Sequence, residues 1–495
     1  MALDLEYMNS DLAVLAAAYH GDCEEDAAKK PSGGVGKVLI LRRPPIPKDS
    51  PSLNPPAHGY PDGSGDQPSF VLIEPYAYFA DRLNATTADC SLEGLRLRGK
   101  IKVTFCTAQS PQVSYLCVHA TDYDHTVFAF PPTIVATETD GGLVLLSVVV
   151  ADRSSYDWLR QKPHYFVYDA SVPELRHIKQ PGDEHPVNEH SFAIVRKPKP
   201  DCTYVLAAQA DQFVYGNPCH LCLYHPGTDS WSKLLVNVDS VPYVLTTYKA
   251  IAIGGDSGLV AWVDLSHMIT FCNVLDESPK LRFLRLPTEP QYGSGTPAVR
   301  DVSFLNGHIR FVELQHRDYG WKATIWSIKT GVFSKKAWRI HRELDSSDIL
   351  EPSLPKLKVC EGVTPQPTLS TLDIGLPKLS LQDDCILYLL AKIDYRDRDH
   401  TAWVLAVDMK NKIVQRVAEF SPKRSIALST GYNSSQISKH FKVGPGTSAA
   451  AAARGRAARG MNSGRTAGGT TGRGAGRGRN SGSTTAASTG RGARK

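Results

Sequence analysis

Two cysteines and two histidines lie close together in one short segment, which is the strongest candidate for a metal site. Cys219 and Cys222 have the C-x-x-C spacing of a zinc knuckle, and His225 follows. Structural zinc takes four thiolate or imidazole ligands, and the sequence contains no second C-x-x-C pair. The segment also alternates like a β-strand. We therefore interpret these cysteines as core residues and predict no metal ligand.

A second cluster combines two acids with two imidazoles, the side chains used in acid–base chemistry and in metal binding. It comprises His119, Asp122, Asp124 and His125. The cluster falls where one expected strand ends and the next begins, and surface loops commonly have this composition. The sequence favours an exposed loop here and makes it a candidate for partner recognition, together with the loop at 182–190.

Gly255-Asp-Ser-Gly258 resembles the loop that carries the nucleophile of trypsin-like serine proteases. That chemistry also needs a general base and an orienting acid, and the Ala-Ala-His-Cys context of the base is missing. We predict instead a tight turn that leads into a strand at 259–264.

Gly33-Gly-Val-Gly-Lys37 resembles part of a phosphate-binding loop. The full pattern is G-x-x-x-x-G-K-[ST], and Pro31 and Val38 occupy two of its defining positions. No helix is expected to follow, so we predict no nucleotide site. With no other catalytic pattern present, we expect no enzyme activity, no cofactor and no metal.

The C-terminal segment is rich in arginine and contains no acidic residue. Gly444–Lys495 carries a charge of +10, which leaves −4 for the rest of a chain whose net charge is +6. Arginine neutralises phosphates and stacks on bases, but the aromatic residues that usually stack with it are missing here. The sequence predicts weak, non-specific RNA binding, with an inert, solvated tail as the alternative. The arginines concerned are Arg454, Arg456, Arg459, Arg465, Arg473, Arg477, Arg479, Arg491 and Arg494.

The elements that would position such groups are mostly β-strands. Segments 100–106 and 113–119 alternate polar and apolar residues, and 142–151 is a continuous apolar run typical of a buried strand. A helical or turn pattern at 76–84 precedes them. A unit of strand, short polar turn and second strand then recurs. These units lie at 164–178, 221–235, 259–272, 323–338 and 403–417.

Repeated hairpins with uneven spacing predict a mostly β, antiparallel body, and a β-propeller is the favoured architecture. A sandwich or a split barrel is the alternative, because all antiparallel β-proteins contain hairpins. The body is expected at 69–442. Residues 1–68 are rich in proline and are expected to be mostly disordered, with one short helix at 4–19. The segment 443–495 has no aromatic residue and almost no large aliphatic one, and it is expected to be disordered.

Ten cysteines are scattered through the 495 residues without a framework spacing, so we expect reduced thiols. The first residues lack the basic region of a signal peptide, and no apolar stretch reaches membrane-spanning length. These features predict a cytosolic or nuclear protein that does not enter a membrane.

Several segments between residues 70 and 345 resemble a large plant family known only as domain of unknown function 1618. They are 71–88, 111–119, 231–232, 254–264, 271–276, 300–302 and 309–314. The resemblance implies no known activity and no catalytic residues. Some relatives look like F-box proteins, whose propeller-like body selects substrates for ubiquitination. The first 70 residues here contain nothing like an F-box helix bundle with its Leu-Pro start, which puts a ubiquitin-ligase role in doubt.

Two functions remain open on this evidence. In the first, the β body is a non-catalytic module that binds a protein partner, which the sequence does not identify. In the second, the chain associates weakly with RNA through its arginine-rich tail.

Overall fold

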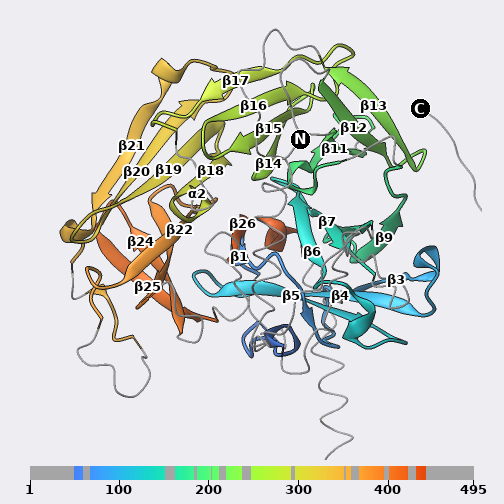
Figure 1. Cartoon of the computed structure of the whole chain (residues 1–495), viewed down its shortest axis with the longest axis horizontal. Helices are drawn as coiled ribbons and strands as arrows, with labels where there is room; N and C mark the ends of the chain where they lie inside the picture. The colour runs from blue at the N-terminus through green and yellow to red at the C-terminus, as the bar shows by residue number, and fades with distance from the viewer. Residues whose placement is uncertain are drawn as a thin grey trace, which may run out of the picture. The chain divides into compact units, whose positions relative to one another are not determined.

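Antiparallel strands dominate the computed structural model, and those of the described residues form six sheets (Figure 1). The structure describes residues 50–59, 67–150, 162–182, 187–201, 203–210, 219–236, 247–290, 296–350, 353–357, 367–394, 401–421 and 431–441. The predicted tail arginines, the phosphate-loop-like segment and the expected helix at 4–19 lie outside these residues.

Each sheet is one blade of a six-bladed β-propeller, and blades 2 to 6 have four antiparallel strands each. Blade 2 contains β6 (Thr133–Thr137), β7 (Leu143–Val148), β8 (His164–Asp169) and β9 (Glu174–Ile178). Blade 3 contains β10 (Ala193–Arg196), β11 (Tyr204–Ala210), β12 (Cys219–His225) and β13 (Ser230–Val236). Blade 4 contains β14 (Lys249–Gly254), β15 (Leu259–Asp264), β16 (Met268–Asn273) and β17 (Arg282–Arg285). Blade 5 contains β18 (Arg300–Leu305), β19 (His308–His316), β20 (Trp321–Lys329) and β21 (Arg339–Asp345). Blade 6 contains β22 (Asp373–Leu379), β23 (Ile386–Lys392), β24 (Ala402–Asp408) and β25 (Ile413–Phe420).

Blade 1 closes the ring by joining the two ends of the body. It contains β1 (Val71–Ile73), β2 (Tyr78–Phe79), β3 (Ala88–Ser91), β4 (Lys100–Cys106), β5 (Val113–Ala120) and β26 (Asn433–Ser435). The late strand β26 pairs antiparallel with the early strand β1, and β1 runs parallel to β5. A single sheet therefore holds segments more than 300 residues apart in the sequence, which fastens the last blade to the first.

Helices are short and scarce among the described residues. They are the α-helical turn α2 (Thr296–Val299) and the 3₁₀ turns η1 (Pro51–Leu53), η2 (Glu93–Leu95), η3 (His125–Val127), η5 (Glu189–Ser191), η6 (Lys335–Ala337), η7 (Ser346–Asp348) and η10 (Ile437–His440). No helix in this described part is long and apolar enough to cross a membrane.

The core lies between the blades, because each sheet is buried on both faces. In β24, Trp403, Leu405 and Val407 pack against blade 5. The alternate residues of β24 pack against blade 1. Side chains on successive residues of a strand point to opposite faces, so a strand buried on both sides must be apolar throughout. This explains the continuous apolar run of β7, as the sequence predicted.

The body begins earlier than the predicted boundary at residue 69. The phenol of Tyr115 donates to the carbonyls of Pro56 and His58 at 2.8 and 2.7 Å. The His58 ring lies 2.8 Å from the carbonyl oxygen of Val113, at the start of β5. Residues 50–59 are thus attached to blade 1 by buried hydrogen bonds, which proline-rich composition alone did not reveal.

The mostly β, propeller-like architecture is confirmed, and two local predictions are wrong. Residues 76–84 form no helix but contain the short strand β2, which pairs with β5. The second strand of the unit at 323–338 begins only at Arg339. The intervening Trp338 is buried and donates its indole N–H to the carbonyl of Arg285 at 3.0 Å. This anchor ties the connection to blade 4 and delays the strand.

Candidate functional site

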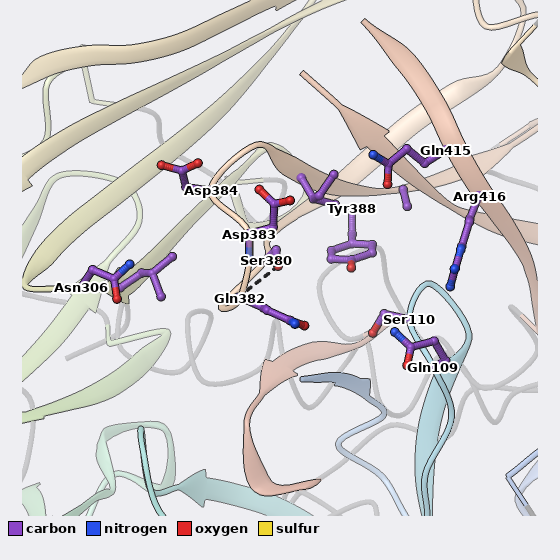
Figure 2. A pocket seen from close by; sticks show the side chains of 13 residues that line it. Gln109, Ser110, Asn306, Ser380, Gln382, Asp383, Asp384, Tyr388, Gln415 and Arg416 are labelled. Atoms are coloured by element: carbon purple, nitrogen blue, oxygen red, sulfur yellow. Dashed lines mark hydrogen bonds between the residues drawn. The ribbon is translucent and has the colours of Figure 1, made fainter. Parts of the chain in front are cut away.

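A polar hollow at the junction of blades 6 and 1 is the candidate functional site (Figure 2). Its volume is about 590 Å³, within the about 300–1,000 Å³ that is usual for ligand pockets. Blade 6 supplies the floor and one wall, the β4–β5 turn of blade 1 supplies Gln109 and Ser110, and the β18–β19 turn of blade 5 supplies Asn306. Three blades therefore build one recess.

The floor is a row of residues across three strands of blade 6. Tyr388 on β23 pairs with Ala406 on β24, which pairs with Arg416 on β25. Opposed residues of an antiparallel sheet share a face, so all three side chains point from the same side of the blade. Tyr388 is buried and stacks on Phe70 with ring centroids 5.6 Å apart. Burial raises the pKa of Tyr388 to about 12, so its phenol remains protonated at neutral pH.

One wall is the turn between β22 and β23, and its own side chains hold its shape. The Ser380 hydroxyl oxygen accepts the backbone N–H groups of Gln382 and Asp383 at 3.2 and 3.0 Å (Figure 2). One carboxylate oxygen of Asp383 accepts the N–H of Cys385 at 2.8 Å. Side-chain acceptors of this kind replace the backbone pairing that a turn lacks. The wall is consequently preformed.

Asp384 links this turn to blade 5. Its carboxylate lies 3.4 Å from Arg310, 3.4 Å from His341 and 3.6 Å from Arg342. Partial burial acts to raise the pKa of Asp384, but the Cys385 thiol hydrogen bond and the nearby positive charges outweigh it and hold that pKa below its usual range. Burial, followed by the two guanidinium groups, lowers the pKa of His341. The pairing at neutral pH is therefore between one carboxylate and two arginines.

Other polar groups of the hollow have no internal partner among the described residues. The Arg416 guanidinium forms no ion pair there, and the second oxygen of Asp383 accepts no hydrogen bond. The side-chain amides of Gln109, Gln382 and Asn306 are likewise without a described partner. All five side chains are exposed. They can exchange water for a ligand without breaking an internal bond.

The wall of the hollow also contains the best-placed metal-ligating side chains of the described residues. Asp383, Asp384 and Cys385 are the one group of three neighbouring metal-ligating side chains in the described residues. Asp384 is already paired with cations, and burial followed by the Asp384 hydrogen bond raises the pKa of the Cys385 thiol. Zinc requires deprotonated thiolates, so this group is a poor ligand set.

The structure places the zinc-like segment on β12. Cys222 is fully buried, in agreement with its predicted core position. The His225 ring contacts the Ser232 hydroxyl of the neighbouring strand at 2.9 Å, and burial lowers the pKa of this histidine. The side chain of Cys219 lies outside the described residues. Cys222 and His225 therefore belong to the packing and hydrogen bonding of blade 3.

The cluster of acids and histidines lies where β5 ends, as the sequence predicted: His119 is on β5, and Asp122, Asp124 and His125 follow it. Asp124 accepts the backbone N–H of Thr126 at 2.9 Å and caps η3. His119 lies 3.9 Å from Asp81, and the His125 ring packs near Phe79. These contacts give the cluster structural roles. Gln109 and Ser110 precede β5 and this cluster lies where it ends, so the hollow and the cluster are at opposite ends of one strand.

The second predicted recognition loop, 182–190, is described at residue 182 and from residue 187 on. Glu189 accepts hydrogen bonds from Ser147 at 2.8 Å and from the Tyr165 phenol at 2.9 Å. The backbone N–H of Asn188 donates to the carbonyl of Gln209 at 3.1 Å. This part of the loop is bound between blades 2 and 3.

The protease-like motif is a tight turn, as predicted, and it leads directly into β15. Gly254, Gly255 and Gly258 adopt positive φ angles. A Cβ atom on Gly258 would lie 2.6 Å from the side chain of Leu275. Glycine is thus required here by backbone conformation and by close packing.

Sequence reasoning missed the hollow itself. Its polar residues are glutamines, asparagine, serines and single charges in ordinary turns, which match no motif. The nearest available signal is the pair of adjacent acids Asp383 and Asp384 followed by Cys385 before a strongly apolar strand.

Comparison with protein families supports the resemblance in part of the chain. Residues 262–388 match the family described as "Protein of unknown function (DUF1618)". The matched region begins within β15 and ends within β23, on the pocket residue Tyr388. No curated protein sequence matches this chain.

Solved structures similar to the chain include TolB from Acinetobacter baumannii, with 12% identity over 60% of this chain and 57% of TolB and a TM-score of 0.26. The chain therefore spans little more than half of TolB. The C-terminal domain of Pseudomonas aeruginosa PilY1 has 9% identity over 69% of this chain and 87% of that domain, with a TM-score of 0.32. The β-propeller domain of Myceliophteria thermophila Cps50 (Swd1) has 7% identity over 57% and 87%, with a TM-score of 0.26. These values are low, so the propeller assignment rests on the strand pairing of this chain.

Proposed function

We propose that this chain is a non-catalytic protein-interaction module, and that the hollow at the junction of blades 6 and 1 is its recognition site. The observation that carries the proposal is the set of exposed polar side chains around this recess that have no partner among the described residues. Partner-free donors, acceptors and charges on a rigid scaffold are suited to recognition, because binding does not first have to break internal contacts.

The rigidity of the site comes from its supports. The Ser380 and Asp383 hydrogen bonds fix the wall, the pairing of Asp384 with blade 5 fixes its orientation, and the stacked Tyr388 and Phe70 fix the floor. A preformed site loses little conformational entropy on binding. An interaction surface built in this way can be specific without being large.

The family match assigns no activity and is compatible with this class of function. We propose a plant origin on the basis of that resemblance, in which some relatives look like F-box proteins with a substrate-selecting propeller body. The scattered cysteines support a cytosolic or nuclear location, where thiols remain reduced. Recognition of another protein requires none of the catalytic patterns that the sequence lacks.

The experiment compares one disruptive substitution with a matched control in the full-length protein. Arg416→Glu reverses the charge on the pocket floor, and Arg176→Glu makes the same change on an exposed arginine of the outer strand β9, away from the hollow. Each protein is immobilised and exposed to an extract of its source organism, and retained proteins are identified by mass spectrometry. Circular dichroism and thermal unfolding confirm that both variants fold.

We expect at least one protein to be retained by the wild type and by Arg176→Glu but lost from Arg416→Glu. An identical set on all three would contradict the hollow as the recognition site. Loss only after substitution of Asp122, Asp124 and His125 would instead move recognition to the loop after β5.

A further inference from the structure

We infer that the hollow takes an extended peptide segment that carries an acidic side chain and a basic side chain, the first bound by Arg416 and the second by Asp383. This inference rests on the proposed function and specifies the chemistry of the partner. It follows from which charges around the hollow are neutralised within the protein and which are not.

Among the described residues that line the hollow, Arg416 is the positively charged side chain without an ion pair. It is the outermost member of the floor row Tyr388, Ala406 and Arg416, and Figure 2 shows its side chain reaching along the edge of the recess. Arg310 and Arg342 already share the carboxylate of Asp384. A guanidinium group binds a carboxylate through two parallel hydrogen bonds, which makes an acidic side chain its best ligand.

Of the two carboxylates that line the hollow, Asp383 is the one without an ion pair among the described residues. Its neighbour Asp384 faces two arginines and a histidine of blade 5, so it has little capacity left for a ligand. Asp383 accepts only the backbone N–H of Cys385 from the described residues, and its other oxygen faces solvent at the rim. A lysine or arginine side chain of a ligand would neutralise the charge of Asp383. Figure 2 shows Asp383 and Arg416 on different sides of the Tyr388 ring, so the two charges select two separate side chains.

Four amide side chains line the hollow, and three of them lack a described partner, since Gln415 already donates to Asp408 at 2.9 Å. Gln109 comes from blade 1, Gln382 from blade 6 and Asn306 from blade 5. Each amide offers both a donor and an acceptor, which is the same complement that each peptide group of a backbone presents. An extended peptide, whose backbone groups are not paired internally, can satisfy these amides along its length.

Two other ligand classes fit less well. Carbohydrates commonly rest on an exposed aromatic ring, but Tyr388 is only 7% exposed and stacks on Phe70. Nucleic acids carry a phosphate at every residue, and Asp383 and Asp384 would repel them at the rim. A peptide with one acidic and one basic side chain is complementary to a site that itself contains both a positive and a negative side chain.

The test is a selection from a displayed library of random short peptides on the immobilised full-length protein. Four proteins are compared: the wild type, Arg416→Glu, the charge exchange Arg416→Asp with Asp383→Arg, and the control Arg176→Glu. Wild type and control should enrich peptides with one acidic and one basic residue at a constant spacing. Arg416→Glu should lose the acidic preference, and the exchange should restore both preferences in reversed order.

A synthetic peptide from the enriched set then gives affinities by fluorescence anisotropy. Its dissociation constant should rise about tenfold or more with Arg416→Glu, the size expected for one charge-assisted contact, and should not change with Arg176→Glu. Enriched peptides without the charge pattern, or binding insensitive to Arg416→Glu, would overturn this inference. If Arg416→Glu still lost its protein partner in the extract experiment, the proposed function would hold even though the peptide inference had failed. Failure of the wild type to enrich any peptide would overturn the peptide ligand, and the extract experiment would again decide the function.

Discussion

Arg300 and Arg416 carry the same charged group on neighbouring blades, yet their surroundings differ in almost every respect. Arg300 is 1% exposed and donates to Glu313 at 2.8 Å through Nε. It also donates to the carbonyls of Leu265 and Glu289 at 3.1 and 2.8 Å, and so ties blade 5 to blade 4. Arg416 is exposed and has no ion pair among the described residues.

The difference separates charges that hold the fold from charges that remain available. The desolvation of Arg300 is offset only by its internal partners, so removing one of them leaves a buried charge uncompensated. Arg416 keeps its water until a ligand arrives, and its removal should leave the fold almost unchanged. The number of internal partners, rather than the residue type, therefore indicates which charges serve recognition.

The largest effect is expected from breaking the buried pair. Glu313→Ala leaves Arg300 without its counter-charge and should lower the free energy of unfolding by about 3–5 kcal/mol. Urea denaturation of the full-length protein measures this. Arg416→Ala should stay within about 0.5 kcal/mol of the wild type, as is usual for surface substitutions.

The double variant Arg300→Met with Glu313→Leu is the control for charge. It removes both ions and should cost less than Glu313→Ala alone, since no unpaired charge is left behind. An equal or smaller loss in the single variant would mean that an unpaired Arg300 charge is not what destabilises the fold.

A histidine pair on blade 2 extends the comparison to pH. His164 and His177 have ring centroids 5.5 Å apart, and burial followed by the neighbouring His177 lowers the pKa of His164 from 6.5 to about 4. The unfolded chain thus binds more protons than the folded one between these values, so the free energy of unfolding should fall as pH decreases from 6.5 to 4. His164→Phe should make this fall less steep in urea titrations at several pH values.

His316, exposed at the end of β19, is the matched position for a histidine outside the core. His316→Phe should leave the pH dependence of stability as it is in the wild type. The interpretation would fail if both variants had the same slope.

Asp384 lies between the two extremes, since it is 40% exposed but pairs with blade 5. Asp384→Asn should lower the free energy of unfolding by about 1–3 kcal/mol, because the Arg310 side chain is only 8% exposed and loses its counter-charge. It should also weaken peptide binding severalfold, since the turn that carries Gln382 and Asp383 loses its anchor. Asp348→Asn removes the more exposed pair with Lys412 and should affect neither quantity strongly. Unchanged peptide affinity in Asp384→Asn would show that the turn holds its position without the pair.

The smallest effect on the β body is expected for the charges of the C-terminal segment. The nine tail arginines, from Arg454 to Arg494, lie outside the described residues, and RNA binding by them stays a prediction. Replacing all nine by Gln should weaken binding to a random single-stranded RNA without changing the stability of the body. Anisotropy titrations at two salt concentrations test this. Equal affinity of both proteins, or binding that ignores salt, would favour the inert tail.

Local sequence patterns correctly predicted most of the strands and turns. The units at 164–178, 221–235, 259–272 and 403–417 are hairpins in the structure, and the Gly255–Gly258 segment is the turn that was predicted. These features are local: the period of apolar residues sets the strand, and glycine or Asp and Asn set the turn. The apolar run of β7 was also correctly predicted to be a buried strand.

The number of blades, the closure by β26 on β1 and the location of the recess depend on contacts between distant segments, so they became visible only in the tertiary structure. Gln109, Asn306, Gln382 and Arg416 are far apart in the sequence and meet only because the ring brings blades 5, 6 and 1 together. Whether an arginine is neutralised or free depends on which carboxylate packs beside it. That neighbour can come from the adjacent strand, as Glu313 does for Arg300, or from another blade, as Asp384 does for Arg310, and in both cases it is distant in the sequence.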